Sequence, residues 1–82
     1  MASAIGECVV KATRKAGQGM PGQWLVKCRG EEVGLIEQWA GSGQPWMAYY
    51  PIGMLSRKVG SFSGAGARQR ATNAVLQAAG LI

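Results

Sequence analysis

Residues 23–39, QWLVKCRGEEVGLIEQW, decide the fold, because they contain two strand-like runs on either side of a short turn. The first run covers residues 23–29 and the second covers residues 32–39, which leaves Gly30 and Glu31 as the connection. Glycine readily adopts the positive φ that a tight hairpin turn requires. The stretch therefore predicts an antiparallel hairpin at the centre of the domain.

The alternation of side chains along these two runs predicts which face of the hairpin is buried. In the first run, the residues expected to face the core are Trp24, Val26 and Cys28. The opposite, more polar face consists of Gln23, Leu25, Lys27 and Arg29. The second run has apolar residues on both faces, so we expect it to lie centrally in the sheet or to be partly covered on both sides.

Three further segments are expected to extend this sheet. Residues 46–52 follow a loop of glycines and a proline, and Pro51 limits pairing near the end of that strand. Residues 58–62 form a short last strand. Residues 7–13 form a weaker strand at an edge, joined to the hairpin by a basic, glycine-rich loop over residues 14–22.

The C-terminal segment predicts a single helix over residues 64–79. Small or apolar side chains recur there at three- and four-residue spacing, and the face they make consists of Ala67, Ala71, Ala74, Val75 and Ala78. We expect this face to pack on the sheet near Trp24 and Val26. Ser61 or Ser63 is expected to cap the start of the helix, and Gly80 is expected to end it.

These elements predict an α+β fold, an antiparallel sheet of four to five strands with one C-terminal helix packed across it. The 82 residues are expected to form a single domain, residues 1–82, with a loose N-terminus at 1–6, a sheet within 7–62 and a helix over 64–79. The sequence shows neither an apolar run long enough to cross a bilayer nor a secretion signal. We therefore expect a cytoplasmic location and no membrane partner.

The two cysteines, Cys8 and Cys28, are expected to be buried, reduced thiols. No other Cys and no His lie at metal-ligand spacing, so no metal site is predicted. A disulfide between adjacent strands is sterically possible and would imply an oxidising compartment. Free thiols are preferred, because nothing else in the sequence points to such a compartment.

The chain contains no His and no Asp, and its only acids are Glu7, Glu31, Glu32 and Glu37. A Ser-His-Asp or Cys-His arrangement therefore cannot be built. A pair of catalytic carboxylates would require Glu31 or Glu32 together with Glu37, yet the first two lie beside the hairpin turn, where solvated charge is ordinary. We predict a non-enzymatic protein with no catalytic residues and no cofactor.

The net charge of +5 is unevenly distributed, because every acid lies at or before Glu37 and the later residues carry cations alone. This asymmetry favours a polyanionic partner, with nucleic acid first and an acidic protein second. A solvated basic surface that only aids solubility is the other interpretation. The predicted nucleic-acid-binding residues are Arg14, Lys15, Lys27, Arg29, Arg57, Lys58, Arg68 and Arg70.

The run QWLVK at residues 23–27, the run VGSF at residues 59–62 and the regularly spaced alanines that follow resemble a known pattern. Over residues 23–79 the chain is similar to the Apetala-type DNA-binding domain of plants and to the arm-site-binding domain of phage tyrosine recombinases. In those families the exposed face of a three-stranded sheet enters the major groove, and a helix packs on the other face. The resemblance implies the same use of the sheet here.

By position, the resemblance assigns structural roles to Trp24 and Phe62. It places Lys27 and Arg29 on the exposed face of the matching first strand. The sequence therefore predicts a small accessory or regulatory module that binds nucleic acid, with duplex DNA as the expected partner. The alternative is a small inhibitor or adaptor that binds a nucleic-acid-processing protein, such as a phage- or plasmid-encoded anti-CRISPR-like or host-takeover protein.

Overall fold

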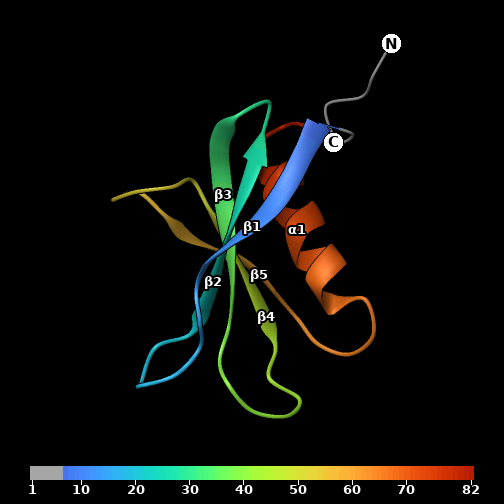
Figure 1. Cartoon of the computed structure of the whole chain (residues 1–82). Helices are drawn as coiled ribbons and strands as arrows, with labels where there is room; N and C mark the ends of the chain where they lie inside the picture. The colour runs from blue at the N-terminus through green and yellow to red at the C-terminus, as the bar shows by residue number, and fades with distance from the viewer. Residues whose placement is uncertain (1–6) are drawn as a thin grey trace.

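A computed structural model describes residues 7–82 as a five-stranded sheet with one helix packed on one of its faces (Figure 1). The elements in chain order are β1 (Cys8–Arg14), β2 (Gly22–Cys28), β3 (Glu31–Gln38), β4 (Trp46–Tyr50), β5 (Arg57–Phe62) and α1 (Ala67–Ala78). Each strand pairs antiparallel with the next one along the chain. The predicted α+β class, with an antiparallel sheet and a C-terminal helix, is confirmed. The expectation of a loose terminus at residues 1–6 lies outside the described residues.

The β2–β3 hairpin turns at Arg29 and Gly30, one residue earlier than predicted. Their φ angles are 53° and 80°, and Cys28 faces Glu31 across the turn. Two successive positive φ angles are characteristic of the type I′ turn, whose twist matches the right-handed twist of paired strands. Arg29 therefore belongs to the turn and not to the exposed face of β2, where it was expected.

The core lies between α1 and the facing side of the sheet. Val26, Ile36 and Ala48, from β2, β3 and β4, have no exposed surface. From the helix, Ala71 and Val75 are also completely buried. Fully burying an aliphatic side chain the size of valine or isoleucine stabilises a fold by roughly 1.5–3 kcal/mol. The contact between helix and sheet therefore contributes a large share of the stability.

The helix packs on β3, β4 and β5. Gly34 of β3 permits this close approach, because a Cβ there would lie 2.5 Å from Cγ1 of Val75. The helix is centred on these three strands, and the prediction that it packs near Trp24 and Val26 agrees with the core, because Val26 belongs to the same buried cluster as Ala71 and Trp24 packs against that cluster. Ala78, which was expected on the packing face, is exposed.

The helix begins at Ala67, three residues later than predicted, and Gly66 is its N-cap residue with a φ of 75°. No side chain caps this end, so the prediction of a serine cap is wrong. Ser61 lies within β5, and Ser63 lies before a glycine turn in which Ala67 N–H donates to the Gly64 carbonyl at 3.2 Å.

The predicted helix end at Gly80 is confirmed. Gly80 has a φ of 76°, and its N–H donates to the Gln77 carbonyl at 3.0 Å. The N–H of Leu81 donates to the Leu76 carbonyl at 2.9 Å. This pair of bonds is the Schellman pattern, in which glycine adopts the left-handed conformation that ends a helix.

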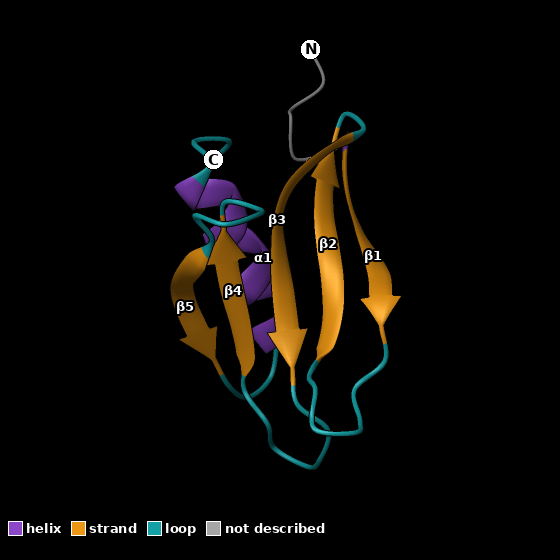
Figure 2. Ribbon diagram, turned by 90° about the vertical axis from the view of Figure 1, so that its left-hand side faces the viewer, coloured by secondary structure: helices purple, strands orange, loops and turns teal. Residues whose placement is uncertain are grey.

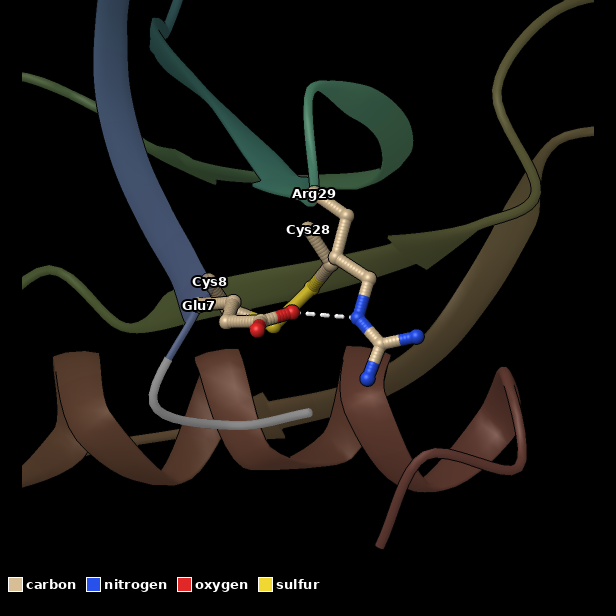
Figure 3. The surroundings of a disulfide bond; sticks show 4 residues. All are labelled: Glu7, Cys8, Cys28 and Arg29. Atoms are coloured by element: carbon tan, nitrogen blue, oxygen red, sulfur yellow. Dashed lines mark hydrogen bonds and ion pairs between the residues drawn. A yellow bond between two sulfur atoms is a disulfide. The ribbon is translucent and has the colours of Figure 1, made fainter. Parts of the chain in front are cut away.

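Cys8 and Cys28 form a disulfide (Figure 3), so the prediction of free thiols is wrong. The register places the two residues directly opposite each other on β1 and β2, with their Cα atoms 4.0 Å apart. Alternation along each strand could be predicted from the sequence, but which residue faces which across the two strands could not. The bond links the edge strand to the sheet at a point beyond the three strands on which α1 packs.

The single named helix, α1, contains 12 residues. A helix that crosses a bilayer needs about 20 predominantly apolar residues. Within residues 7–82, no helix is long and apolar enough to span a membrane.

Candidate nucleic-acid interface

The sheet face that points away from α1, called the open face, carries no second layer in the described part of the chain; Figure 2 views the molecule from this side, with the helix behind the strands. One residue from each strand forms a continuous row across it, in the order Lys11, Leu25, Leu35, Tyr49 and Lys58. The neighbouring positions on the same face include Val9, Lys27, Glu37 and Met47. The open face therefore combines an apolar centre with lysines towards both edges.

Lys11 and Lys58 lie at the two ends of this row, and both are exposed. Adjacent strands are about 4.8 Å apart, so the backbones of these two residues are separated by roughly 19 Å. Neither lysine forms an ion pair within residues 7–82. Both ammonium groups are therefore available to an external anion.

Lys27 lies between these two on the open face, half-buried on β2. It faces Val9 of β1 and Glu32 of β3, next to an irregularity in the register of β2 and β3. The described residues include no ion pair to Lys27, even though a carboxylate occupies the facing position. Glu32 therefore reduces the local positive charge without binding the ammonium group directly.

The apolar centre of the open face includes the aromatic ring of Tyr49, opposite Leu35. The ring is partly buried, and its hydroxyl donates to Sδ of Met47 at 3.8 Å. Burial, and secondarily the carboxylate of Glu37, raises the pKa of Tyr49 above its ordinary value of 10.0. The hydroxyl is therefore neutral at physiological pH, and the ring presents a flat, uncharged surface.

Arg14 is occupied by contacts within the protein. Its guanidinium group forms an ion pair with Glu37 at 3.3 Å, and its Nε donates to the Pro21 carbonyl at 2.8 Å. Gln23 donates to the same carboxylate at 3.2 Å. These bonds connect the end of β1 to β2 and β3, which gives Arg14 a structural role.

Arg29 is also paired within the protein. Its guanidinium group forms an ion pair with Glu7 beside the disulfide (Figure 3). Arg29 lies at the β2–β3 turn, whereas Lys27 lies within the strand. The two residues therefore do not form the shared surface that was expected of them.

The two arginines of the helix lie on the other side of the sheet. Arg68 stacks over Trp46, with the guanidinium carbon 5.8 Å from the ring centroid, and Trp46 in turn lies 4.8 Å from Trp24. Arg70 donates to the carbonyl of Ala65 at 2.9 Å and to that of Ser63. These cations support the turn before the helix and the aromatic pair beneath it.

The eight predicted residues therefore do not form one surface. Lys27 and Lys58 lie on the open face, Lys15 is exposed in the β1–β2 loop, and Arg57 is exposed at the start of β5. Sequence reasoning missed Lys11, although its position between Val10 and Ala12 on a predicted strand would have placed it opposite the core.

Within residues 7–82, no group of three or more His, Cys, Asp or Glu side chains could hold a metal ion. Comparisons with protein-family models, with curated proteins and with solved structures found no match to this chain. The candidate interface therefore depends on the geometry of its own residues.

Proposed function

We propose that this protein is a non-enzymatic module that binds single-stranded nucleic acid across the open face of its sheet. The observation that supports this most is the row that runs across all five strands, with Tyr49 in it and the unpaired Lys11 and Lys58 at its ends. In this proposal the lysines contact phosphates, and the tyrosine ring stacks on a base. Combining cationic grooves with aromatic platforms is the common way in which proteins bind single strands.

The width of the sheet favours a single strand over insertion into duplex DNA. Five strands span roughly 19 Å between the first and the last, whereas the major groove is about 12 Å wide. The families that the sequence resembles use three strands, which would span about 10 Å. Contact with duplex DNA through part of the sheet stays a prediction, which the titration below compares with the single strand.

The second candidate is binding to a protein, as an inhibitor or adaptor. It is favoured by the apolar centre of the open face, where Leu25, Leu35 and Met47 are partly exposed and Val9 is 60 % exposed. Partly exposed apolar groups that lie together on a protein surface often mark a site where another protein binds. The two candidates differ in what the lysines do, because phosphate contact needs them and a largely apolar protein interface does not.

A fluorescence-anisotropy titration with a single-stranded oligonucleotide, an RNA and a DNA duplex tests the proposal. The variant Lys11→Gln/Lys27→Gln removes two charges from the open face, and Arg68→Gln/Arg70→Gln removes two charges from the helix side as a matched control. The logarithm of the binding constant falls as the logarithm of the salt concentration rises. We expect the first pair of substitutions to make this slope less negative by about 1.4 for the single strand, which corresponds to two phosphate contacts. The helix pair should leave that slope nearly unchanged.

Stacking is tested by Tyr49→Ala and Tyr49→Phe. Loss of the ring should weaken binding to the single strand by about 1–3 kcal/mol, whereas phenylalanine keeps the ring and should bind nearly as well. If the wild-type protein binds none of the three nucleic acids at low salt, the proposal is wrong and protein binding becomes the leading candidate.

The cytoplasm is the proposed place of action, and the Cys8–Cys28 disulfide makes that proposal testable. Reducing compartments keep most thiols free, so a protein that works there with this bond intact would be unusual. Rapid alkylation of the thiols in intact cells, followed by mass measurement, shows whether Cys8 and Cys28 are free thiols or a disulfide. A fully oxidised pair in cells would argue for an oxidising compartment instead.

A further inference from the structure

The β4–β5 loop ends in an apolar tip that projects from the sheet on the side away from α1 (Figure 1). Met54 is fully exposed and Leu55 is 81 % exposed, the two largest exposures among the large apolar residues in the described chain. A hydrogen bond from Ser56 N–H to the Gly53 carbonyl, at 3.0 Å, closes the turn beneath them. Two adjacent large apolar side chains presented on a closed turn are typical of an interaction site.

A cleft of about 600 Å³ lies at the same end of the molecule. Its apolar lining comes from the β2–β3 hairpin, the base of the β4–β5 loop and the C-terminal segment, and includes Val33, Ile52 and Leu81. Glu31 and Glu32 also line it, and both are exposed. Neither carboxylate forms an ion pair in the part of the chain that the structure describes.

The loop and the cleft are complementary in both polarity and charge. Directly after the apolar tip, Arg57 and Lys58 are exposed, and neither is in an ion pair with a described residue. The loop thus presents apolar groups followed by two cations, and the cleft presents an apolar lining next to two carboxylates. Apolar groups of the loop thus match an apolar lining, and its cations match two carboxylates. Arg29 also lines the cleft, but its guanidinium group is already in an ion pair with Glu7.

We propose that the occupant of the cleft is the β4–β5 loop of a second copy of this chain. In such a dimer, Met54 and Leu55 of each copy enter the cleft of the other, and Arg57 and Lys58 lie against the partner's Glu31 and Glu32. The dimer contact and the phosphate contact proposed for Lys58 therefore exclude each other. A twofold interface requires that the two complementary features lie close together on one surface. The loop and the cleft are neighbours at one end of the molecule, because Pro51 and Ile52 at the base of the loop also line the cleft.

Sedimentation equilibrium of the full chain over a range of concentrations tests the dimer without any nucleic acid. The mass should rise from 8.6 kDa towards twice that value as concentration increases. Met54→Ser/Leu55→Ser should stay monomeric. Met20→Ser, which alters a 49 % exposed apolar residue in the β1–β2 loop at the opposite end, is the control and should associate as the wild type does.

Charge exchange tests the ion pairs. Glu31→Lys/Glu32→Lys and Arg57→Glu/Lys58→Glu each place like charges across the interface, and each should weaken association by at least about tenfold. An equimolar mixture of these two variants should associate again, because both contacts in the mixed dimer are then attractive. A chain that carries all four substitutions should also dimerise. Thermal melting by circular dichroism checks that each variant is folded.

Three results would overturn the proposal. A mass of 8.6 kDa for the wild type at every concentration would exclude the dimer. Undiminished association of the Met54→Ser/Leu55→Ser variant would place the contact elsewhere, and failure of the charge-exchanged mixture to associate would show that the pairing is not the one proposed. Binding of a folded, monomeric wild type to anionic lipid vesicles or to an acidic peptide would assign the loop to a different partner.

Discussion

The two edge strands of this sheet, β1 and β5, are attached to it in different ways. Both are mostly exposed, but α1 packs against β5 and its neighbours, and Phe62 of β5 contacts the buried cluster. β1 lies beyond the three strands on which α1 packs, although Cys8 and Val10 of β1 also contact the buried cluster. It is connected at one end by the Cys8–Cys28 disulfide and at the other by the ion pair of Arg14 with Glu37.

The comparison indicates that an edge strand on which the helix does not pack has local bonds in addition to burial. Small domains have little apolar surface to bury, and disulfides commonly compensate for this. The difference also matters for function, because β1 carries Lys11 at one end of the proposed binding row. The shape of the open face therefore depends on the bonds that position β1.

The largest expected effect comes from removing the disulfide by Cys8→Ala/Cys28→Ala. The bond closes a loop with a sequence separation of 20, and the chain-entropy model gives such a crosslink about 3 kcal/mol of stabilisation. Chemical denaturation should show a loss of that order, and amide exchange should accelerate in β1 more than in β5. Equal acceleration in both edge strands would show that the disulfide does not act on β1 in particular.

A smaller effect is expected from overpacking the contact between helix and sheet with Ala71→Leu. Ala71 is completely buried, so the added atoms have no room and should cost about 1–3 kcal/mol. Ala78→Leu makes the same change at an exposed position of the same helix and should alter stability by less than about 0.5 kcal/mol. Ala71→Leu should accelerate amide exchange in β5 more than in β1, the reverse of the disulfide variant. Equal thermal stability of the two variants would mean that the helix packs through another face.

The smallest effect is expected from Arg14→Gln, which breaks the ion pair at the other end of β1. The pair is only partly buried, with 32 % of the arginine side chain exposed, so its loss should cost about 1 kcal/mol or less. Lys15→Gln removes the same charge from the adjacent, exposed residue and serves as the control. Faster amide exchange at the end of β1 in the first variant alone is the expected result. Identical exchange in both variants would show that the ion pair does not stabilise β1.

The sequence was sufficient for the architecture because alternation and helical spacing are local properties. The core face of β2, the central position of β3 and the helix end at Gly80 all follow from patterns a few residues long. The disulfide could not be predicted, since it depends on the register between β1 and β2. Arg29 was misplaced because a shift of one residue in the turn moves a side chain from a strand face to the turn itself.

Which of the predicted cations are available to a partner could not be predicted from the sequence, for a related reason. The sequence alone treats Arg14, Lys27 and Arg70 as equivalent cations. In the structure, however, Arg14 forms an ion pair with Glu37, and Arg70 donates a hydrogen bond to the Ala65 carbonyl. Which cations remain available is a property of the tertiary structure. Lys11, which was not among the predicted residues, lies at the end of the row because β1 pairs with β2 in this register.

Amide chemical shifts of the isotope-labelled protein, recorded by NMR during addition of a single-stranded oligonucleotide, test the central proposal most directly. If the oligonucleotide binds across the open face, the largest chemical-shift changes should occur around Lys11, Lys27 and Tyr49, on three different strands. The amides near Arg68 and Arg70 should change little. Changes confined to the helix side, with none on β1, β2 and β4, would contradict the proposed role of the open face.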